Sequence, residues 1–318
     1  MDRRGLGMDG LVNLLKPPGM SSHDAVNWLR RRLGFKRIGH LGTLDPAAAG
    51  VLPLCLGTAT RLAEYMAGWD KEYRAEMVLG VVTDSQDTSG EVRSLRPGRE
   101  VDAKAVREAL QRQVGTRRQV PPMVSAVKFE GRRLYKLARE GREVEPPPRE
   151  ITVHFLRLKQ VLGGRPFCRV VFDARVSKGT YIRTLCHDIG RELGCGGALA
   201  FLVRTRVGPF RLEEAWSREE IEEEISRGLD RFILPSDFGI LEWPAWTLAP
   251  EGLKRIQHGR EVGLADVIKG EAPAGGTLMR LLDPAGKLVA VGQAHWQRGS
   301  PVCQPQKVLI DSQKTAGV

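Results

Sequence analysis

Two stretches of alternating residues constrain the fold more than any other feature of this sequence. They are residues 71–79 and residues 167–177. In the first stretch, one side carries Tyr73, Ala75, Met77 and Leu79; in the second, one side carries Cys168, Val170, Phe172, Ala174 and Val176, and the other carries Arg169, Asp173 and Arg175. Because successive side chains of a strand point to opposite faces, each stretch predicts a strand with one face in a core.

Helical segments are interleaved with these strands. Residues 22–33 place apolar side chains at helical spacing, with Ser22 as the expected N-cap and Gly34 just past the end. A second helix is expected from Thr180, its N-cap, to Gly194. This interleaving predicts a mixed α/β domain of the α+β class with a mainly antiparallel sheet.

The C-terminal part of the chain has a different pattern. With 318 residues, the chain has room for about two domains. After residues 241–246, two apolar stretches flank an Asp-Pro-Ala-Gly turn, which predicts a small β-domain. The expected division is a tail, a first domain, a small β-domain and a second tail, at residues 1–10, 11–242, 243–312 and 313–318.

The chain is strongly basic, with a formal net charge of +11 and a pI of about 9.7. A basic surface favours a polyanionic partner, nucleic acid first and an anionic membrane second, although a generally basic proteome gives the same balance. The positive charges are clustered, which favours nucleic acid. The clusters are Arg30, Arg31, Arg32, Lys36 and Arg37; Arg117 and Arg118; and Arg132, Arg133, Lys136 and Arg139.

Two further features concern the cellular compartment. No apolar run reaches the roughly 18 residues needed to span a bilayer, and the first residues lack the apolar core of a signal peptide. The five cysteines are odd in number and scattered without a CxxC pair, which argues for reduced thiols and against a zinc ribbon. We therefore expect a cytoplasmic protein without a membrane partner.

The stretch GHLGTLDPAAAG, residues 39–50, is the first candidate for chemistry. Pro46 pushes Asp45 out of the α region, and the flanking glycines allow tight turns or the close approach of another chain. Asp45 therefore either shapes a turn or is a carboxylate held stiffly where a large partner can come near. His40 either orients a ligand, takes part in acid–base work or is a structural histidine.

The other candidates are single residues with two interpretations each. Arg183 lies on the polar side of the second helix, near its start, where the helix dipole disfavours a cation. It is either a surface residue or the partner of a carboxylate or phosphate. Tyr73 and Tyr181 either belong to the core or stack on a base. His187 and Asp188 lack compact metal-ligand spacing, so no metal site is predicted, and phosphate-loop and GxSxG motifs are absent as well.

Five segments match one family, in order along about residues 11–212. They are NLLKPPGMSSHDAV, GHLGTLDPAAAGVLPLCLGTATRL, KEYRAEMVLGVVTDSQDTSG, VPPMVSAVKFEGRRLYKLAREG and VSKGTYIRTLCHDIGRELGCGGALAFLVRTRVGPF. Together they resemble the pseudouridine synthases, specifically the bacterial tRNA pseudouridine-55 synthase (TruB) family. An ordered series of this length is far more specific than any one of its motifs.

The resemblance implies an isomerase that flips uridine 55 out of the TΨC loop of tRNA, breaks its N1–C1′ bond and rejoins the uracil through C5. It implies that Asp45 is the nucleophile, that Tyr73 stacks on the flipped base and assists proton removal, and that Arg183 pairs with the carboxylate. No cofactor or metal is required. The substrate-binding residues that it implies are His40, Tyr73, Tyr181, Leu202 and Lys16, with Lys16 and Pro17 supporting the site.

The resemblance also implies the remaining architecture and the partner. A tRNA-clamping insertion is expected at about residues 117–149, inside a pseudouridine synthase catalytic domain. The C-terminal domain is expected to be a PUA-like RNA-binding module that contacts the acceptor end or stem. The expected partner is the TΨC stem-loop of tRNA, bound by a monomer without a guide RNA.

Three other interpretations compete with this one. A guide-RNA-dependent synthase shares the GHxGTLDP motif, but the insertion favours an enzyme that acts without a partner. A glycoside or nucleoside hydrolase usually needs two facing carboxylates, and the Asp45 stretch offers one. A non-catalytic RNA-binding protein explains the basic charge but not the Asp45 loop.

Overall fold

The computed structural model describes residues 8–97 and 101–310, except for residues 126, 135, 136, 138, 139, 143, 145 and 165. The predicted tail at 313–318 and most of the tail at 1–10 therefore lie outside the described residues, as do Lys136 and Arg139 of the basic clusters. No helix in the described ranges is long and apolar enough to cross a membrane. All five cysteines are buried thiols.

A nine-stranded sheet forms the larger part of the molecule. Its strands are β1 (Gly10–Lys16), β2 (Ile38–His40), β3 (Ala49–Leu56), β4 (Lys71–Leu79), β7 (Gly115–Gln119), β10 (Arg149–Leu162), β11 (Arg169–Val176), β12 (Gly197–Val207) and β13 (Phe210–Arg211). The order is β1–β3–β12–β4–β11–β10–β7, with β2 beside β3 and β13 beside β12. Only β3 and β12 pair in parallel among the described strands of this sheet, which confirms the predicted mainly antiparallel sheet.

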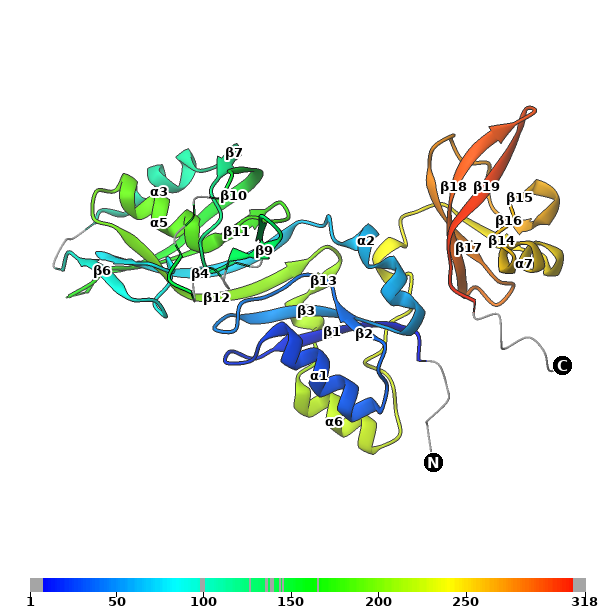
Figure 1. The fold of residues 1–318 in the computed structure, drawn as a ribbon, viewed down its shortest axis with the longest axis horizontal. Coiled ribbons are helices and arrows are strands. Elements are labelled where there is room, and N and C mark those ends of the chain that lie inside the picture. The colour runs from blue at the N-terminus through cyan, green and yellow to red at the C-terminus, as the bar shows by residue number, and fades with distance from the viewer. Residues whose placement is uncertain are drawn as a thin grey trace.

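The two alternating stretches are confirmed as the central strands β4 and β11, which pair with each other. Helices α3 (Ala103–Arg112) and α5 (Ile182–Glu192) lie together over this half of the sheet (Figure 1). On the outer face, Arg74 Nε lies 2.8 Å from Asp173 Oδ1. The inward side chains of the two strands form one core with both helices and include Ala75, Met77, Leu79, Val170, Phe172 and Ala174.

The other half of the sheet is covered by α1 (Ser22–Leu33) and α6 (Arg218–Ser226), which lie side by side beneath β1 (Figure 1). The bounds of α1 match the predicted helix, and Gly34 follows it in the left-handed conformation, with φ of 61°. Leu14 and Leu52, from β1 and β3, pack with Leu29 of α1 in a second core.

The starts of two helices differ from the prediction. Ser21, not Ser22, is the N-cap of α1, because its extended backbone lets its hydroxyl accept from the amide of Asp24. Ser22 falls inside the first turn, where its hydroxyl can bind another segment. In α5 the N-cap position belongs to Tyr181, since the Thr180 hydroxyl donates to a preceding backbone carbonyl instead of capping the helix.

The C-terminal part forms a second sheet, with the order β15–β19–β18–β17–β14–β16. Trp246 is fully buried in its core. The predicted hairpin and its turn are confirmed, since the Gly286 amide donates to the Asp283 carbonyl at 2.9 Å. The bounds are β14 (Ala245–Leu248), α7 (Pro250–Gln257), β15 (Val262–Gly263), β16 (Val267–Lys269), β17 (Leu278–Leu282), β18 (Leu288–Gln297) and β19 (Ser300–Val308).

The second sheet lies at the right of Figure 1 and is anchored there to the part of the chain that precedes it. Arg280 of β17 forms a buried ion pair with Asp237, at 2.8 Å. Apolar residues of both parts join in one cluster, which includes Leu62, Met66, Leu288, Val291 and Leu309.

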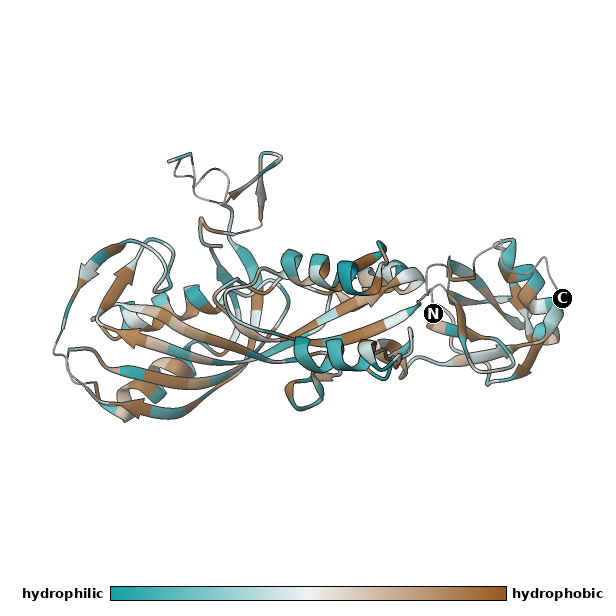
Figure 2. Ribbon diagram, turned by 90° about the horizontal axis from the view of Figure 1, so that it is seen from below, coloured by the Kyte–Doolittle hydropathy of each residue, from teal (hydrophilic) through white to brown (hydrophobic). Residues whose placement is uncertain are grey.

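Shorter elements complete the fold. The hairpin of β8 (Lys128–Phe129) and β9 (Arg132–Arg133) follows β7 and precedes β10 in the chain, and it projects from the body of the molecule in Figure 2. Strands β5 (Val81–Thr83) and β6 (Val92–Leu95) flank a polar loop. Helix α2 spans Ala63–Met66, and 3-10 helices span Gly57–Leu62, Leu212–Glu214, Phe238–Ile240 and Leu264–Asp266.

Gly50 marks a close approach of two strands, and we expect Gly50→Ala to lower the free energy of unfolding by about 3 kcal/mol. Its φ is +112°, and a Cβ there would lie 2.2 Å from the carbonyl oxygen of Arg204. Gly39→Ala is the matched control, because a Cβ at Gly39 meets nothing within 4 Å. Urea unfolding of both variants measures the difference; equal stabilities would contradict the expectation.

Candidate active site

Asp45 lies at the centre of the candidate site, in the loop between β2 and β3. Ser22 fixes this loop from α1: its hydroxyl accepts a hydrogen bond from the Leu44 amide at 2.8 Å and donates one to the Leu44 carbonyl at 3.0 Å. The Ala48 amide closes the turn on the Asp45 carbonyl at 3.1 Å. The carboxylate of Asp45 remains 44% exposed, so it projects from a fixed backbone towards solvent.

Arg204, which sequence reasoning missed, holds the same loop from β12. It is 1% exposed, and its guanidinium donates to the carbonyls of Val51 (2.7 Å), Thr43 (3.0 Å) and Gly42 (3.2 Å). One signal was available in the sequence. Arg204 follows Leu202 by two residues in a strand, so both side chains belong to the same buried face.

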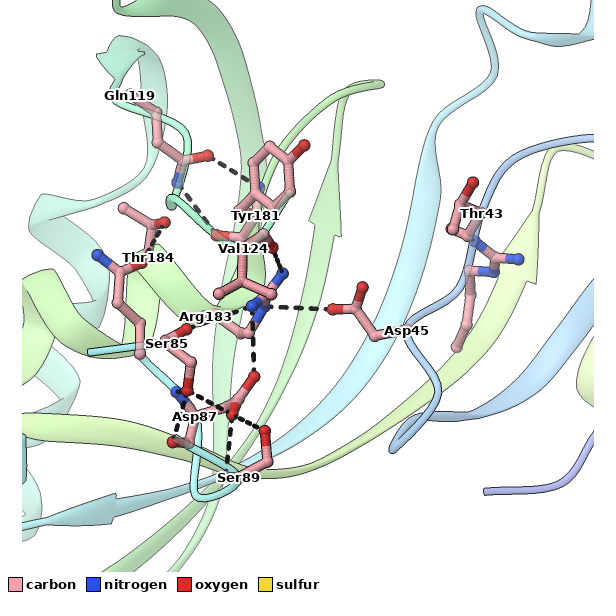
Figure 3. A network of polar contacts seen from close by, with 12 residues as sticks. Thr43, Asp45, Ser85, Asp87, Ser89, Gln119, Val124, Tyr181, Arg183 and Thr184 are labelled. Atoms are coloured by element: carbon pink, nitrogen blue, oxygen red, sulfur yellow. Dashed lines mark hydrogen bonds and ion pairs between the residues drawn. The ribbon is translucent and has the colours of Figure 1, made fainter. Parts of the chain in front are cut away.

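Arg183 is buried, so its predicted place on the polar side of α5 is wrong. Its side chain is 5% exposed, and its Nε lies 3.2 Å from Asp45 Oδ2, as an ion pair without hydrogen-bond geometry. Nη1 lies 3.3 Å from Asp87 Oδ2 and donates to the Ser85 carbonyl, and Nη2 donates to the Val124 carbonyl at 2.9 Å (Figure 3). The loops that follow β5 and β7 fold over the start of α5, and their carbonyl and carboxylate oxygens compensate the buried charge of Arg183.

Asp87, the second carboxylate on Arg183, was not predicted as a site residue. Its Oδ1 accepts hydrogen bonds from the Ser85 hydroxyl (2.7 Å) and from the amide (3.0 Å) and hydroxyl of Ser89. These bonds orient the carboxylate, so that Oδ2 faces the guanidinium (Figure 3). Arg183 is thereby held between a fixed carboxylate and the more exposed one of Asp45.

Tyr73 lies on the inward face of β4 and is half-buried. Burial raises the pKa of Tyr73, and the charge of Asp45 adds to the rise, whereas the guanidinium of Arg204, within hydrogen-bonding reach of the phenol, opposes it. The phenol therefore lies close to Arg204 and within the electrostatic influence of Asp45. At neutral pH it is a neutral donor and acceptor.

Tyr181 is tied to the base of the insertion. Its amide donates to the side-chain oxygen of Gln119 at 2.8 Å, and the Gln119 amide group donates to the Tyr181 carbonyl at 3.1 Å (Figure 3). The ring centre of Tyr181 lies 6.0 Å from the guanidinium carbon of Arg183. Gln119 is another residue that sequence reasoning missed, since its role depends on a contact between distant segments.

The cleft at the site is lined by Asp45, Arg183 and Leu202, together with Ala48 and Phe201. The structure thus brings three predicted site residues together in this cleft. The other predicted site residues are not among the described residues that line it: Lys16, His40, Tyr73 and Tyr181.

His40 is half-buried at the end of β2, immediately before the Asp45 loop. Burial lowers the pKa of His40, and the positive charges of Arg204 and His23 lower it further. Its Nδ1 is buried without a hydrogen-bond partner among the described residues. A neutral imidazole at this position can accept a proton or a hydrogen bond from a bound group.

Lys16 lies beneath the loop and is fully buried. Its ammonium donates to the carbonyls of Pro17 (2.8 Å), Met20 (2.7 Å) and Pro46 (3.3 Å). With all three donors used on the backbone, Lys16 fixes the residue after Asp45. This geometry matches a supporting position and leaves no proton free for a substrate contact.

We expect Lys16→Met to change how stability depends on pH. Burial, aided by the charge of Arg204, lowers the pKa of Lys16 from 10.5 to about 8. Between these values the unfolded chain keeps a proton that the folded chain has lost, so the free energy of unfolding rises with pH across this window. Urea unfolding at pH values of about 7.5 and 10 should show a larger rise in the wild type than in the variant. Equal rises would contradict the assignment.

Metal ligation was not predicted, and within the described ranges no group of three or more His, Cys, Asp or Glu side chains is placed to hold an ion. What the site offers instead is one exposed carboxylate backed by buried cations. Such an arrangement holds the carboxylate in place by charge, and a carboxylate is a competent nucleophile at carbon.

Comparison with solved structures defines the class of fold. The chain is similar to a protein of an H/ACA RNP bound to a substrate RNA that contains 2′-deoxyuridine, with a TM-score of 0.71, 25% identity, and 96% of this chain and 86% of that chain covered. It is also similar to a chain of a Cbf5–Nop10–Gar1 complex, with a TM-score of 0.71, 27% identity, and 95% and 85% covered. The predicted pseudouridine synthase fold is confirmed.

Sequence comparison then defines the family. The model of the TruB family pseudouridylate synthase N-terminal domain matches residues 30–182, and that of the tRNA pseudouridylate synthase B C-terminal domain matches residues 183–240. The chain is 48% identical to the tRNA pseudouridine synthase B of Moorella thermoacetica, over 94% of this chain and 99% of that protein. It is 44% identical to the enzyme of that name from Heliobacterium mobile, over 95% of each. The chain belongs to the TruB family of pseudouridylate synthases.

Proposed function

We propose that this protein isomerises uridine 55 in the TΨC loop of tRNA to pseudouridine, without a guide RNA. The observation that carries the proposal is the ion pair between Asp45 and Arg183 at the mouth of a small cleft, on a loop whose backbone is fixed from three sides. Family membership supplies the reaction class, and the relatives named tRNA pseudouridine synthase B supply the substrate class.

Asp45 is the nucleophile in this proposal. The N1–C1′ bond of the uridine breaks, the uracil turns, and a C5–C1′ bond forms; C5 then loses its proton and N1 gains one, so the atoms balance without a cofactor. Attack at C1′, attack at C6 and removal of the C2′ proton all begin from the same ionised carboxylate. Arg183 orients that carboxylate through the ion pair.

The other site residues bind the flipped base. Tyr73 stacks on the uracil and, next to Asp45, accepts or relays the C5 proton. Leu202 and Tyr181 form the apolar walls of the uracil pocket. His40, at the edge of the Asp45 loop, contacts the RNA where the base leaves the stack.

Base flipping requires a source of free energy. Extruding a base from a folded loop costs a few kcal/mol, and contacts between basic side chains and phosphates offset that cost. In this proposal the hairpin of β8 and β9, which projects from the body of the molecule in Figure 2, acts as a basic clamp on the tRNA. The second sheet acts as a PUA-like module that contacts the acceptor end or stem. The five cysteine thiols suit the reducing cytoplasm.

A tritium-release assay tests this function. Purified protein alone, with an unmodified tRNA transcript labelled at C5 of uridine, should release label equivalent to one uridine per tRNA. A transcript with cytidine at position 55 is the control and should release none. No release from the first transcript would overturn the proposal. Release only after a guide RNA is added would favour the guide-dependent type instead.

A further inference from the structure

Arg204 is the largest buried charge at the site to which the family resemblance assigned no role. It lies on β12, is 1% exposed, and has no carboxylate within 4.0 Å among the described residues. Burying an unpaired charge is costly, and a methionine of similar length would fill the same space without that cost. The charge therefore requires a reason other than packing.

The contacts of Arg204 enclose Asp45 from both sides. Nη1 and Nη2 donate to the carbonyls of Thr43 and Gly42, which precede Asp45, and Nε donates to the carbonyl of Val51, which follows it. One planar guanidinium therefore closes the loop across its two ends. The five N–H donors of a guanidinium diverge in one plane, so arginine reaches carbonyls at both ends of the loop, whereas the three donors of a lysine ammonium all leave from one atom.

The backbone of Arg204 is held as tightly as its side chain. Gly50 approaches it so closely that a Cβ would lie 2.2 Å from its carbonyl oxygen. At this point β12 also forms its parallel pairing with β3. The guanidinium is thus presented from a rigid strand, and the loop takes its position from that strand.

The charge of Arg204 also reaches the groups around Asp45. It lowers the pKa of His40 and Lys16, and it opposes the rise in the pKa of Tyr73. These three groups surround the Asp45 loop on different sides. A neutral side chain at this position would leave the loop with less positive charge beneath it.

We propose that Arg204 is a positioning residue, which fixes the ends of the loop that carries Asp45 and supplies buried positive charge beneath Asp45 and Tyr73. This role rests on the proposed function of Asp45. It predicts that Arg204 acts on the chemical step and not on tRNA binding, because its side chain is covered by the loop.

The first test separates turnover from binding. Arg204→Met should lower kcat by about 100-fold, the effect of misplacing a reacting group by about 1 Å, and should leave the Kd for tRNA within about threefold. Arg204→Lys keeps the charge but loses the fork, and should lower kcat by about tenfold. A control on the same strand is Arg206→Met, since the Arg206 side chain donates a hydrogen bond to the Gly208 carbonyl and not to the loop that carries Asp45. Its kcat should stay near that of the wild type.

The second test measures the effect of the Arg204 charge on His40 and the rigidity of the loop, and it does not depend on the role of Asp45. NMR titration should show a higher pKa for His40 in Arg204→Met than in the wild type, and an unchanged one in Arg204→Lys. Amide hydrogen exchange at Leu44 and Ala48 should accelerate in both variants.

Three outcomes overturn the proposal. They are a folded Arg204→Met with wild-type kcat, an unchanged pKa of His40 in that variant, and a folded Arg204→Lys with wild-type kcat and loop exchange. If Arg204→Met does not fold, kcat and loop exchange in Arg204→Lys alone test the proposal, because lysine keeps the charge and about the same volume. If Asp45→Asn proves active while the exchange and titration results hold, the proposed nucleophile fails and the positioning of the loop stands.

Discussion

Asp45→Asn should abolish pseudouridine formation, with turnover lowered by at least about 10⁴-fold. The amide has nearly the same shape as the carboxylate but is neither a nucleophile nor a base, so every chemical route from Asp45 is lost. The loop should keep its place, because its backbone bonds to Ser22, Lys16 and Arg204 do not involve the carboxylate. The Kd for tRNA should therefore change by less than about tenfold. Single-turnover tritium release and filter binding measure the two quantities.

Asp173→Asn is the matched control for this substitution. Asp173 is also paired with an arginine, Arg74, and its side chain is 27% exposed, but it lies on the outer face of the sheet. The loss of such an exposed pair costs about 1 kcal/mol or less of stability, and turnover should stay near that of the wild type. Full turnover by Asp45→Asn would remove Asp45 as the nucleophile, and equal losses in both variants would point to a general effect of charge.

The sequence predicted those parts of the fold that depend on local periodicity. The alternation in residues 71–79 and 167–177 identified β4 and β11, because each side chain in a strand reports its own face. The Asp-Pro-Ala-Gly turn identified the hairpin of β17 and β18 for the same local reason. The proline and glycines around Asp45 marked its loop as a candidate, but they left a structural turn open, and only the resemblance of five segments to one family gave Asp45 its role.

The sequence did not predict how the site is supported, because that depends on contacts between distant segments. Arg204 bonds the carbonyl of Thr43, 161 residues away, and Gln119 bonds Tyr181, 62 residues away. Arg183 seemed to lie on the polar side of a helix, since helical periodicity does not show that another loop covers the first turn. The Ser21 and Ser22 pair shows the same limit, because which hydroxyl caps the helix depends on the partner that the other one finds.

Arg183→Met should lower both turnover and stability. The guanidinium contacts the carboxylates of Asp45 and Asp87 and the carbonyls of Ser85 and Val124. Its removal leaves Asp87 largely buried and without a counter-charge, which should lower the free energy of unfolding by about 2–3 kcal/mol. Turnover should fall by about 10³-fold, because Asp45 loses the cation that holds it aligned. Urea unfolding and single-turnover kinetics measure these effects.

Two further variants separate the catalytic part of this effect from the structural part. Asp87→Asn alone removes the second carboxylate and leaves Arg183 its contact with Asp45. The double variant Arg183→Met/Asp87→Asn should recover most of the stability lost in Arg183→Met, since no largely buried carboxylate is left without a counter-charge. Its turnover should not recover, because Asp45 still lacks its arginine. Arg183→Lys keeps the charge but cannot reach all four oxygens, and should lie between the wild type and Arg183→Met in turnover. Recovery of turnover together with stability in the double variant would show that Arg183 only maintains the fold and that Asp45 acts without it.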